Sequence, residues 1–533
     1  MAGTVGSLCL VLHAHLPYVR HPEYDSFLEE DWLFEAVIET YIPLLTMMER
    51  LAQDGVPFRL TMSLTPSLLG MLRDGLLQER TRHHIESLFE LAEKEIRRTR
   101  NMPAYHPLAL MYRDHYADCL RLLDNCGGDL TQRFRAFQDD GFLEVITCGA
   151  THAFFPLWVH QPETVRAQVQ IGANYYESVL GRRPRGIWLP ECGYYPGHER
   201  FLSEAGIQFF FVEAHGVLFA SPRPKYGTFA PVLCPDYPVA AFGRDLESSK
   251  QVWSANEGYP GDFDYREFYR DVGYDLDYDY VAPYLGGDGK RKNLGLKYYR
   301  ITGPNSEIDL GAKQPYNPAA ARQKAADHAA NFVFNRQQQM RYANEVLGRA
   351  PLVVAPYDAE LFGHWWWEGP MFIEYLFRKL HHDQEEIKPT TPSEYLQENP
   401  VLQQCQPELS SWGYKGYAEF WLNDTNDWIY RHLHMAGERM IHLARRFETP
   451  NDIERRALNQ CARELVLAQA SDWAFIMRTG TMVEYARKRT SDHLARFEAL
   501  FLGLEYGDLN LDLLQDAEWR DNLFPDIDYK VYR

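Results

Sequence analysis

Short apolar runs alternate with longer amphipathic stretches from Leu8 to about Pro407. The runs have the length and the β-branched or aromatic content of buried strands, and stretches such as Trp32–Leu51 have helical spacing. Strands that alternate with helices predict βα units and a parallel sheet, which we expect to close as a barrel. The expected strands are Leu8–His13, Phe58–Leu64, Leu143–Cys148, Gly186–Leu189, Phe209–Val212 and Leu352–Ala355.

Two regions depart from this alternation. Between residues 221 and 302, glycine, proline, tyrosine and aspartate crowd together, which is typical of the long ordered loops that form lids or binding surfaces. After Pro407, apolar residues recur at helical spacing, as at Leu458, Cys461 and Leu465. Because 533 residues exceed what one hydrophobic core usually holds, we predict a C-terminal helical domain beside the barrel.

Charge and composition exclude several classes of protein. The chain has 55 Lys and Arg against 74 Asp and Glu, a net charge of −19, so we expect no nucleic-acid partner. No apolar stretch approaches the ~20 residues of a membrane helix, and residues 1–18 lack the basic start of a signal peptide. The eight cysteines are scattered without a C-x-x-C pair, which suits a reduced cytoplasm and offers no zinc site.

Two acidic residues follow expected strands, where βα barrels carry their chemistry. Glu191 stands in the segment Trp188–Cys192, directly after a proline, and Asp358 stands in Val353–His364, beside three tryptophans. A glycosidase needs one rigidly aimed carboxylate as nucleophile and a second, with a raised pKa, as general acid. Asp358 and Glu360 both suit the acid by residue type, and their spacing does not separate them.

His13 and His15 place two imidazoles on one face of a strand end. Metal-dependent barrel hydrolases use such pairs, and His152 and His364 could supply further ligands. Neutral imidazoles can equally bind sugar hydroxyls through hydrogen bonds, and this is the role that we prefer.

Three residues of the C-terminal region have ordinary interpretations when taken alone. Asp472 lies inside a helical pattern, where an acid is usually a solvated surface charge, and Trp412 and Trp421 could pack between domains. They would serve a functional site only if the helices folded back over the mouth of the barrel.

Five segments in order resemble glycoside hydrolase family 57, and within it the α-1,4-glucan branching enzymes: His13–Tyr18, Gly149–His152, Trp188–Cys192, Ala355–Trp365 and Ser471–Trp473. The resemblance covers essentially the whole chain. It implies an α/β fold, an incomplete (β/α)7 barrel with a small inserted helical subdomain and a C-terminal all-helical domain that completes the cleft. We expect the barrel at 1–189 and 237–406, the subdomain at 190–236 and the helical domain at 407–533.

The resemblance also implies roles for single residues. Glu191 would be the nucleophile and Asp358 the general acid/base, with no catalytic metal and no cofactor. A tyrosine at a loop tip over the active site would favour branching over hydrolysis, and Tyr237 is the candidate. The implied substrate-binding residues are His13, His15, His152, Trp412, Trp421 and Asp472, with Arg270 and Gly287 added by approximate alignment of the glycine-rich loops.

The expected function is therefore retaining cleavage of an α-1,4-glucan and transfer to a 6-hydroxyl, with some hydrolysis. Amylose, amylopectin and glycogen are the expected substrates. Related activities, 4-α-glucanotransferase or α-amylase, differ only in the acceptor. A metal-dependent barrel hydrolase and a non-catalytic glucan-binding protein are more distant alternatives, and the oligomeric state stays open.

Overall fold

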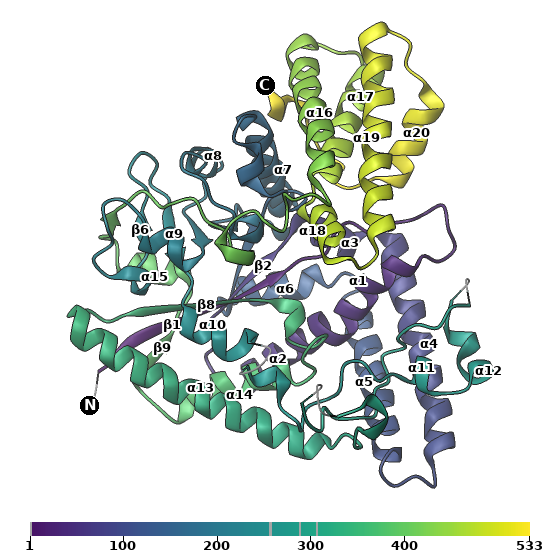
Figure 1. The fold of residues 1–533 in the computed structure, drawn as a ribbon, viewed down its shortest axis with the longest axis vertical. Coiled ribbons are helices and arrows are strands. Elements are labelled where there is room, and N and C mark those ends of the chain that lie inside the picture. Colours follow the sequence, from purple (N-terminus) through teal and green to yellow (C-terminus); the bar gives the residue numbers. More distant parts are fainter. Residues whose placement is uncertain (1–2, 255–257, 287–288, 305–307) are drawn as a thin grey trace.

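A computed structural model describes residues 3–254, 258–286, 289–304 and 308–533. A curled sheet lies at the centre, helices cover its outer side, and a bundle of C-terminal helices stands over one end (Figure 1). This is the expected fold class, a half-barrel of sheet and helices with a helical C-terminal region, and the prediction is confirmed.

The central strands run parallel in the order β7-β5-β4-β3-β2-β1-β8. All six expected strands are present, and β7 is an addition. No ladder between described residues joins β7 to β8, although Asp245 N–H donates to Val354 O at 2.8 Å, so the barrel is incomplete. The strands are β1 (Gly6–Ala14), β2 (Leu60–Leu64), β3 (Leu143–Cys148), β4 (Gly186–Trp188), β5 (Phe209–Val212), β7 (Ala240–Gly243) and β8 (Leu352–Asp358).

Three short strands extend the sheet. They are β6 (Val232–Leu233), antiparallel to β7, β9 (Ile387–Pro389), which pairs with the start of β1, and β10 (Gln403–Gln404), which pairs with β6.

Helices from the first three quarters of the chain surround the sheet. The helix expected at Trp32–Leu51 is present as α1 and α2, joined by a π-helical turn at Val37–Tyr41. The helices are α1 (Asp31–Ala36), α2 (Ile42–Gln53), α3 (Pro66–Arg73), α4 (Gly75–Thr99), α5 (His106–Asn125), α6 (Thr131–Asp139), α7 (Pro162–Leu180), α8 (Glu199–Glu204), α9 (Ala214–Leu218), α10 (Leu246–Trp253), α11 (Val272–Asp275), α12 (Tyr278–Val281), α13 (Pro318–Leu347), α14 (Gly369–His382) and α15 (Pro392–Glu398).

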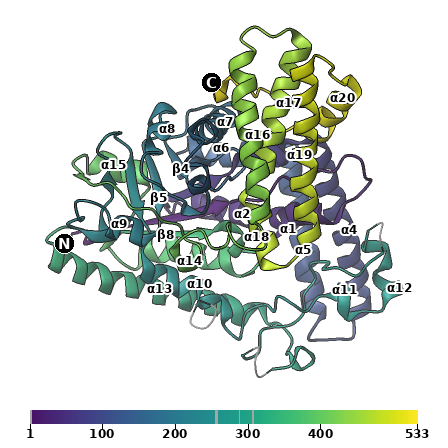
Figure 2. The ribbon, with the colours of Figure 1, turned by 45° about the horizontal axis from the view of Figure 1, so that its top comes forward.

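The C-terminal helices form the bundle seen from a second side in Figure 2. Leu458, Cys461 and Leu465 are fully buried on α17, as their spacing predicts. The short helix α18 lies at the end of the bundle nearest the sheet (Figure 1). The bundle consists of α16 (Asp427–Arg446), α17 (Asp452–Ala468), α18 (Ser471–Thr479), α19 (Val483–Tyr506) and α20 (Leu511–Arg520).

The range 190–236, where we expect a small inserted helical subdomain, also contributes a strand to the main sheet, and the subdomain stays a proposal. This range contains β5, which lies between β4 and β7 in the main sheet, with the short helices α8 and α9 on either side. Since Phe209–Val212 is an apolar run that must be covered on both faces, the sheet is where it can be buried. The boundary between barrel and helical domain at residue 407 stays a proposal.

Two further observations concern membrane-spanning helices and the cysteines. Among the residues described, no helix has the length and apolar character that crossing a bilayer requires. All eight cysteines are buried as free thiols.

Candidate active site

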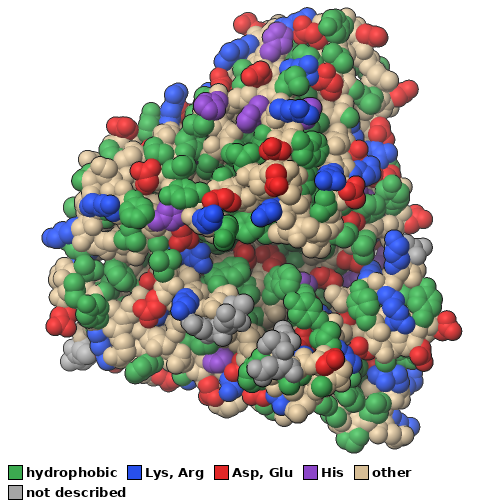
Figure 3. Space-filling model, viewed as in Figure 1, with side chains coloured by type: hydrophobic (Ala, Val, Ile, Leu, Met, Phe, Trp, Pro, Cys, Tyr) green, Lys and Arg blue, Asp and Glu red, His purple; other side chains and the backbone are tan. Residues whose placement is uncertain are grey.

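A cavity of about 780 Å³ opens at the carboxyl ends of the strands. Figure 3 shows this face of the molecule hollowed across its middle, with acidic side chains inside the hollow. Strand ends β1 and β8, the turn after β4, the segment after residue 411 and helix α18 all contribute to the wall. Its lining includes eight of the residues singled out from the sequence: His13, His15, His152, Glu191, Asp358, Trp412, Trp421 and Asp472.

The turn that carries Glu191 has an unusual backbone. Glu191 and Cys192 have φ angles of 60° and 50°, in the left-handed region that residues with a side chain seldom occupy, and His152 on the next loop has φ 65°. Trp412 N–H donates to the carbonyl of Glu191 at 3.0 Å, and Ser471 N–H donates to that of His152 at 3.1 Å. Backbone hydrogen bonds from the C-terminal part of the chain, at Trp412 and Ser471, therefore stabilise both strained turns.

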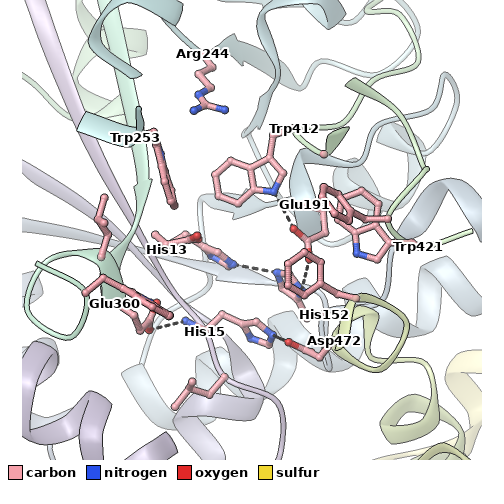
Figure 4. Close-up of a pocket in the computed structure, with 17 residues that line it drawn as sticks. His13, His15, His152, Glu191, Arg244, Trp253, Glu360, Trp412, Trp421 and Asp472 are labelled. Carbon is pink, nitrogen blue, oxygen red and sulfur yellow. Dashed lines mark hydrogen bonds and ion pairs between the residues drawn. The ribbon is translucent and has the colours of Figure 1, made fainter. Parts of the chain in front are cut away.

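Each oxygen of the Glu191 carboxylate accepts one hydrogen bond. Trp412 Nε1–H donates to Oε2 at 2.8 Å (Figure 4), and the Ser471 hydroxyl lies 3.2 Å from Oε1. Burial raises the pKa of Glu191 to about 7, although the Trp412 hydrogen bond opposes that rise. Asp472 raises this pKa further, whereas His15 and Ser471 lower it. The group is a carboxylate aimed by two fixed donors.

Asp358 has a different environment at the end of β8. Its carboxyl receives no hydrogen bond from the residues that the structure describes. Burial raises its pKa well above the usual range, and the nearby carboxylates of Glu360 and Glu191 raise it further, while Arg244 lowers it. This environment favours the protonated form of Asp358.

Glu360, two residues further on, is tied to its neighbours. Tyr41 O–H donates to Oε1 at 2.5 Å, and His15 N–H donates to the same oxygen at 3.1 Å. The loop fits tightly, because a Cβ at Gly363 would lie 1.9 Å from Glu39 O, and Gly363 has φ +130°. Glu360 thus holds the strand end and the π-helical turn together.

The three histidines form a compact stack. The His15 and His152 rings lie 3.8 Å apart, and His13 stacks on Trp188 at 4.8 Å. All six ring nitrogens have partners: His13 contacts Ser63 and His152, His15 contacts Thr65 and Asp472, and His152 contacts His13 and Ser471.

A metal ion is the alternative use of these groups. One ligand atom from each of His15, His152 and Asp472 lies within 4.8 Å of the others, which is close enough to surround an ion. Because each of the ring nitrogens already has a protein partner, the stack is held together by its own hydrogen bonds.

Aromatic rings form much of the remaining wall. Trp421 is fully buried and stacks on Phe154 at 4.3 Å, and its indole N–H has no partner among the described residues. Trp365 is exposed and stacks on Phe268 at 4.5 Å. Flat apolar faces beside hydrogen-bonding groups suit sugar rings, which present C–H faces and hydroxyl edges.

Asp472 lies in the first turn of α18 and not in the middle of a helix as expected. Its two oxygens each lie 3.1 Å from His15 Nε2, and the positive end of the helix dipole favours its charge. Burial lowers the pKa of His15, but the neighbouring carboxylates of Asp472, Glu191 and Glu360 raise it, and the net shift is upward.

Comparison with known proteins identifies the family of this chain. Residues 9–407 match the model of glycosyl hydrolase family 57, and residues 432–532 match the 1,4-alpha-glucan branching enzyme C-terminal domain. This chain belongs to glycosyl hydrolase family 57. The resemblance found in the sequence is confirmed.

Three family 57 relatives are similar over nearly the whole chain. A crystal structure described as an alpha-amylase, AmyC from Thermotoga maritima, is 45% identical with a TM-score of 0.93 and covers 99% of both chains. The branching enzyme of Pyrococcus horikoshii is 34% identical with a TM-score of 0.88, over 99% of this chain and 97% of that one. The 1,4-alpha-glucan branching enzyme of Thermococcus kodakarensis is 34% identical over 97% of this chain and 77% of that protein.

Two of the expected family 57 site residues are not in the described lining of the cavity. Arg270 pairs with Asp275 at 3.0 Å and lies over the Tyr299 ring, and it is not among the described residues of the lining. Tyr237 lies in the turn before β7, at the amino end of that strand, whereas the cavity opens at the carboxyl ends of the strands. Gly287 lies outside the described residues.

Arg244 and Trp253 also line the cavity, and neither is predicted from the sequence. Arg244 directly follows β7 and pairs with Glu213 at 3.0 Å, so a basic residue after a short apolar run was the available signal. Trp253 ends α10 inside the loop-rich region, and its sequence neighbours offer no comparable signal.

Proposed function

We propose that this family 57 protein is a retaining 1,4-α-glucan branching enzyme that works with Glu191 and Asp358. The observation that carries the proposal is the contrast between the two carboxyl groups in one cavity: Glu191 accepts two hydrogen bonds, and Asp358 accepts none from the described residues. Two carboxyl groups with different environments can divide the roles of nucleophile and acid.

Glu191 acts as the nucleophile in this proposal. The donors on its two oxygens favour the ionised form and fix the direction of attack on the anomeric carbon. Attack expels the reducing-end part of the glucan and leaves a covalent glycosyl-enzyme.

Asp358 acts as general acid and then as general base. Its raised pKa keeps a proton available for the glycosidic oxygen in the first step. In the second step the same group takes the proton from the 6-hydroxyl of a glucan acceptor, which attacks the glycosyl-enzyme and forms the α-1,6 bond. Glu360 already accepts two hydrogen bonds and is the less suitable acid.

Substrate contacts are proposed for the remaining wall. Trp412 and Trp421 would pack against sugar rings, and Asp472 would accept hydrogen bonds from hydroxyl groups. His13, His15 and His152 would line the same subsite, mainly through their ring faces, because their nitrogens have protein partners. We propose no metal and no cofactor for the reaction.

α-Amylase activity is the second candidate. The relative with 45% identity is described as an alpha-amylase, and no tyrosine is among the described residues that line the cavity. Water would then replace the sugar acceptor, and the outcome depends on how well the aromatic wall excludes water. A 4-α-glucanotransferase would instead use a 4-hydroxyl as acceptor.

One incubation separates these activities. Amylose is treated with the purified protein, and new α-1,6 linkages are counted by proton NMR against new reducing ends. Branching produces α-1,6 linkages in excess of reducing ends, and hydrolysis produces reducing ends alone.

Amylopectin and glycogen are the further proposed substrates. We also propose a cytoplasmic location, which the free, buried cysteines support.

A further inference from the structure

A chain of four hydrogen bonds runs from strand β2 to Glu191. Ser63 Oγ lies 3.2 Å from His13 Nδ1, and His13 Nε2 lies 3.0 Å from His152 Nε2. His152 Nδ1 then lies 2.9 Å from Ser471 Oγ, which lies 3.2 Å from Glu191 Oε1. The four residues before Glu191 are buried, and they come from β2, β1, the loop after β3 and α18.

The carboxylate at the end of this series of hydrogen bonds determines which group donates and which accepts at each step. An ionised carboxylate only accepts, so the single hydrogen of Ser471 must point to Glu191. Ser471 Oγ then accepts from His152 Nδ1–H, which leaves His152 Nε2 as an acceptor. His13 must therefore donate from Nε2, and its Nδ1 accepts the hydrogen of Ser63.

This direction requires that His13 and His152 are neutral. Burial lowers the pKa of both rings well below the usual value, and the neighbouring His15 lowers it further. His15 itself faces Asp472, which favours its charged form. Neutral His13 and His152 fit the hydrogen-bond pattern of the stack.

We propose that Ser471 is a positioning residue, which holds Oε1 of Glu191 through a relay that begins at Ser63. Trp412 alone holds one oxygen and would let the carboxylate turn about its last bond. A second donor on the other oxygen fixes the plane of the group and thus its line of attack. This inference rests on the proposed role of Glu191 as nucleophile.

Because Trp412 and Ser471 both follow the barrel in sequence, the C-terminal part of the chain supplies both donors. Packing of that part against the barrel would therefore place both donors on the Glu191 carboxylate, and it would also form one wall of the cleft.

The first test compares Ser471→Ala with the wild type on amylose across pH. Loss of a hydrogen bond to a charged group should lower kcat/KM about ten- to a hundredfold. Without this donor the ionised form of Glu191 is less favoured, so the acid limb of the kcat/KM profile should move to higher pH. His15, His152, Asp472, Asp358 and Trp412 also face Glu191 and are unchanged in the variant.

Two variants serve as controls. Ser471→Thr keeps the hydroxyl and should restore the position of the acid limb. Ser410→Ala removes another buried serine hydroxyl, which has no hydrogen-bond partner among the described residues, and should leave the profile unchanged. A loss caused merely by packing would lower activity in Ser471→Ala without moving the limb, and that result would overturn the proposal.

The relay itself predicts two further results. Ser63→Ala should shift the acid limb in the same direction but by less, because it removes only the hydrogen bond to His13, at the end of the relay far from Glu191. Nitrogen-15 NMR of the wild-type histidines should show His13 protonated at Nε2 and His152 at Nδ1. The opposite tautomers would overturn the relay, and this measurement needs no variant that must fold. Failure of the proposed branching function is separate, since the wild type would then form no α-1,6 linkages on amylose.

Discussion

Among the described residues, two clusters bring histidine nitrogens and carboxylate oxygens close enough together to surround a metal ion, and one of the two lines the cavity. At the barrel mouth, His15 and Asp472 line the cleft with His152, and every ring nitrogen of the stack has a partner. Inside the C-terminal bundle, Glu464, His493 and Asp521 are all fully or almost fully buried and bring their ligand atoms equally close together.

The neighbours of the second cluster explain its different role. His493 Nδ1 lies 2.7 Å from Glu464 Oε2, and Arg496 Nη1 donates to Asp521 at 2.8 Å. Burial lowers the pKa of His493 to about 3, so this ring is neutral, and its Nε2 has no partner among the described residues. The comparison teaches that burial and shifted pKa values mark polar cores as well as active sites. Access to a cavity distinguishes the two.

The largest expected effect concerns the acids at the barrel mouth. Glu191→Gln and Asp358→Asn should each lower turnover of amylose by at least ~10²–10⁴-fold, because an amide can be neither nucleophile nor acid. Near-UV circular dichroism should show an unchanged fold. Glu360→Gln should lose less, since its carboxylate only accepts hydrogen bonds from Tyr41 and His15. A larger loss at Glu360 than at Asp358 would reverse the acid assignment.

A smaller effect is expected at the partner of His15. Asp472→Ala removes the carboxylate that accepts from this ring and that would bind sugar hydroxyls. A charge-assisted hydrogen bond contributes ~1.5–3 kcal/mol, so kcat/KM should fall roughly ten- to a hundredfold. Steady-state kinetics per folded molecule measures this. If Asp472 only joined the domains, the melting temperature would fall and the kinetics would stay normal.

The second cluster should behave in the opposite way. His493→Ala removes the donor to Glu464 and leaves a small cavity, which should cost about 2–4 kcal/mol of stability. The melting temperature should drop, and kcat and KM at a temperature where the protein is folded should match the wild type. Changed kinetics in the folded variant would show that the distinction between the two clusters is wrong.

The smallest effect is predicted for metal removal. Exhaustive dialysis against a chelator should leave the rate on amylose unchanged, because the nitrogens of the stack bind protein groups. Elemental analysis of the purified protein accompanies the assay. Stoichiometric zinc, with activity lost on its removal and regained on its return, would make the barrel mouth a metal site.

The sequence predicted the strands that bury strong apolar runs and the two acids that follow them. It missed β7, because Ala240 and Ala241 lack the branched side chains of a typical strand and the surroundings are rich in glycine and proline. Arg244 was missed with it.

Other errors have equally local causes. Tyr237 precedes β7 and therefore lies at the amino end of that strand, which the sequence does not reveal as long as β7 itself is not predicted. Asp472 was placed in mid-helix because Gln469 and Ala470 separate α17 from α18 without glycine or proline. The paired hydrogen bonds on Glu191 join residues far apart in the chain, and no local pattern predicts them.

The central claim, that Glu191 is the nucleophile and Asp358 the acid/base, can be tested directly by mass spectrometry. Asp358→Asn is incubated with α-maltosyl fluoride, whose leaving group needs no protonation, so the covalent intermediate should form and then persist without a base. The account predicts a peptide containing Glu191 that is heavier by one maltosyl unit. A maltosyl group on Glu360 or on another residue, or rapid turnover without any adduct, would contradict it.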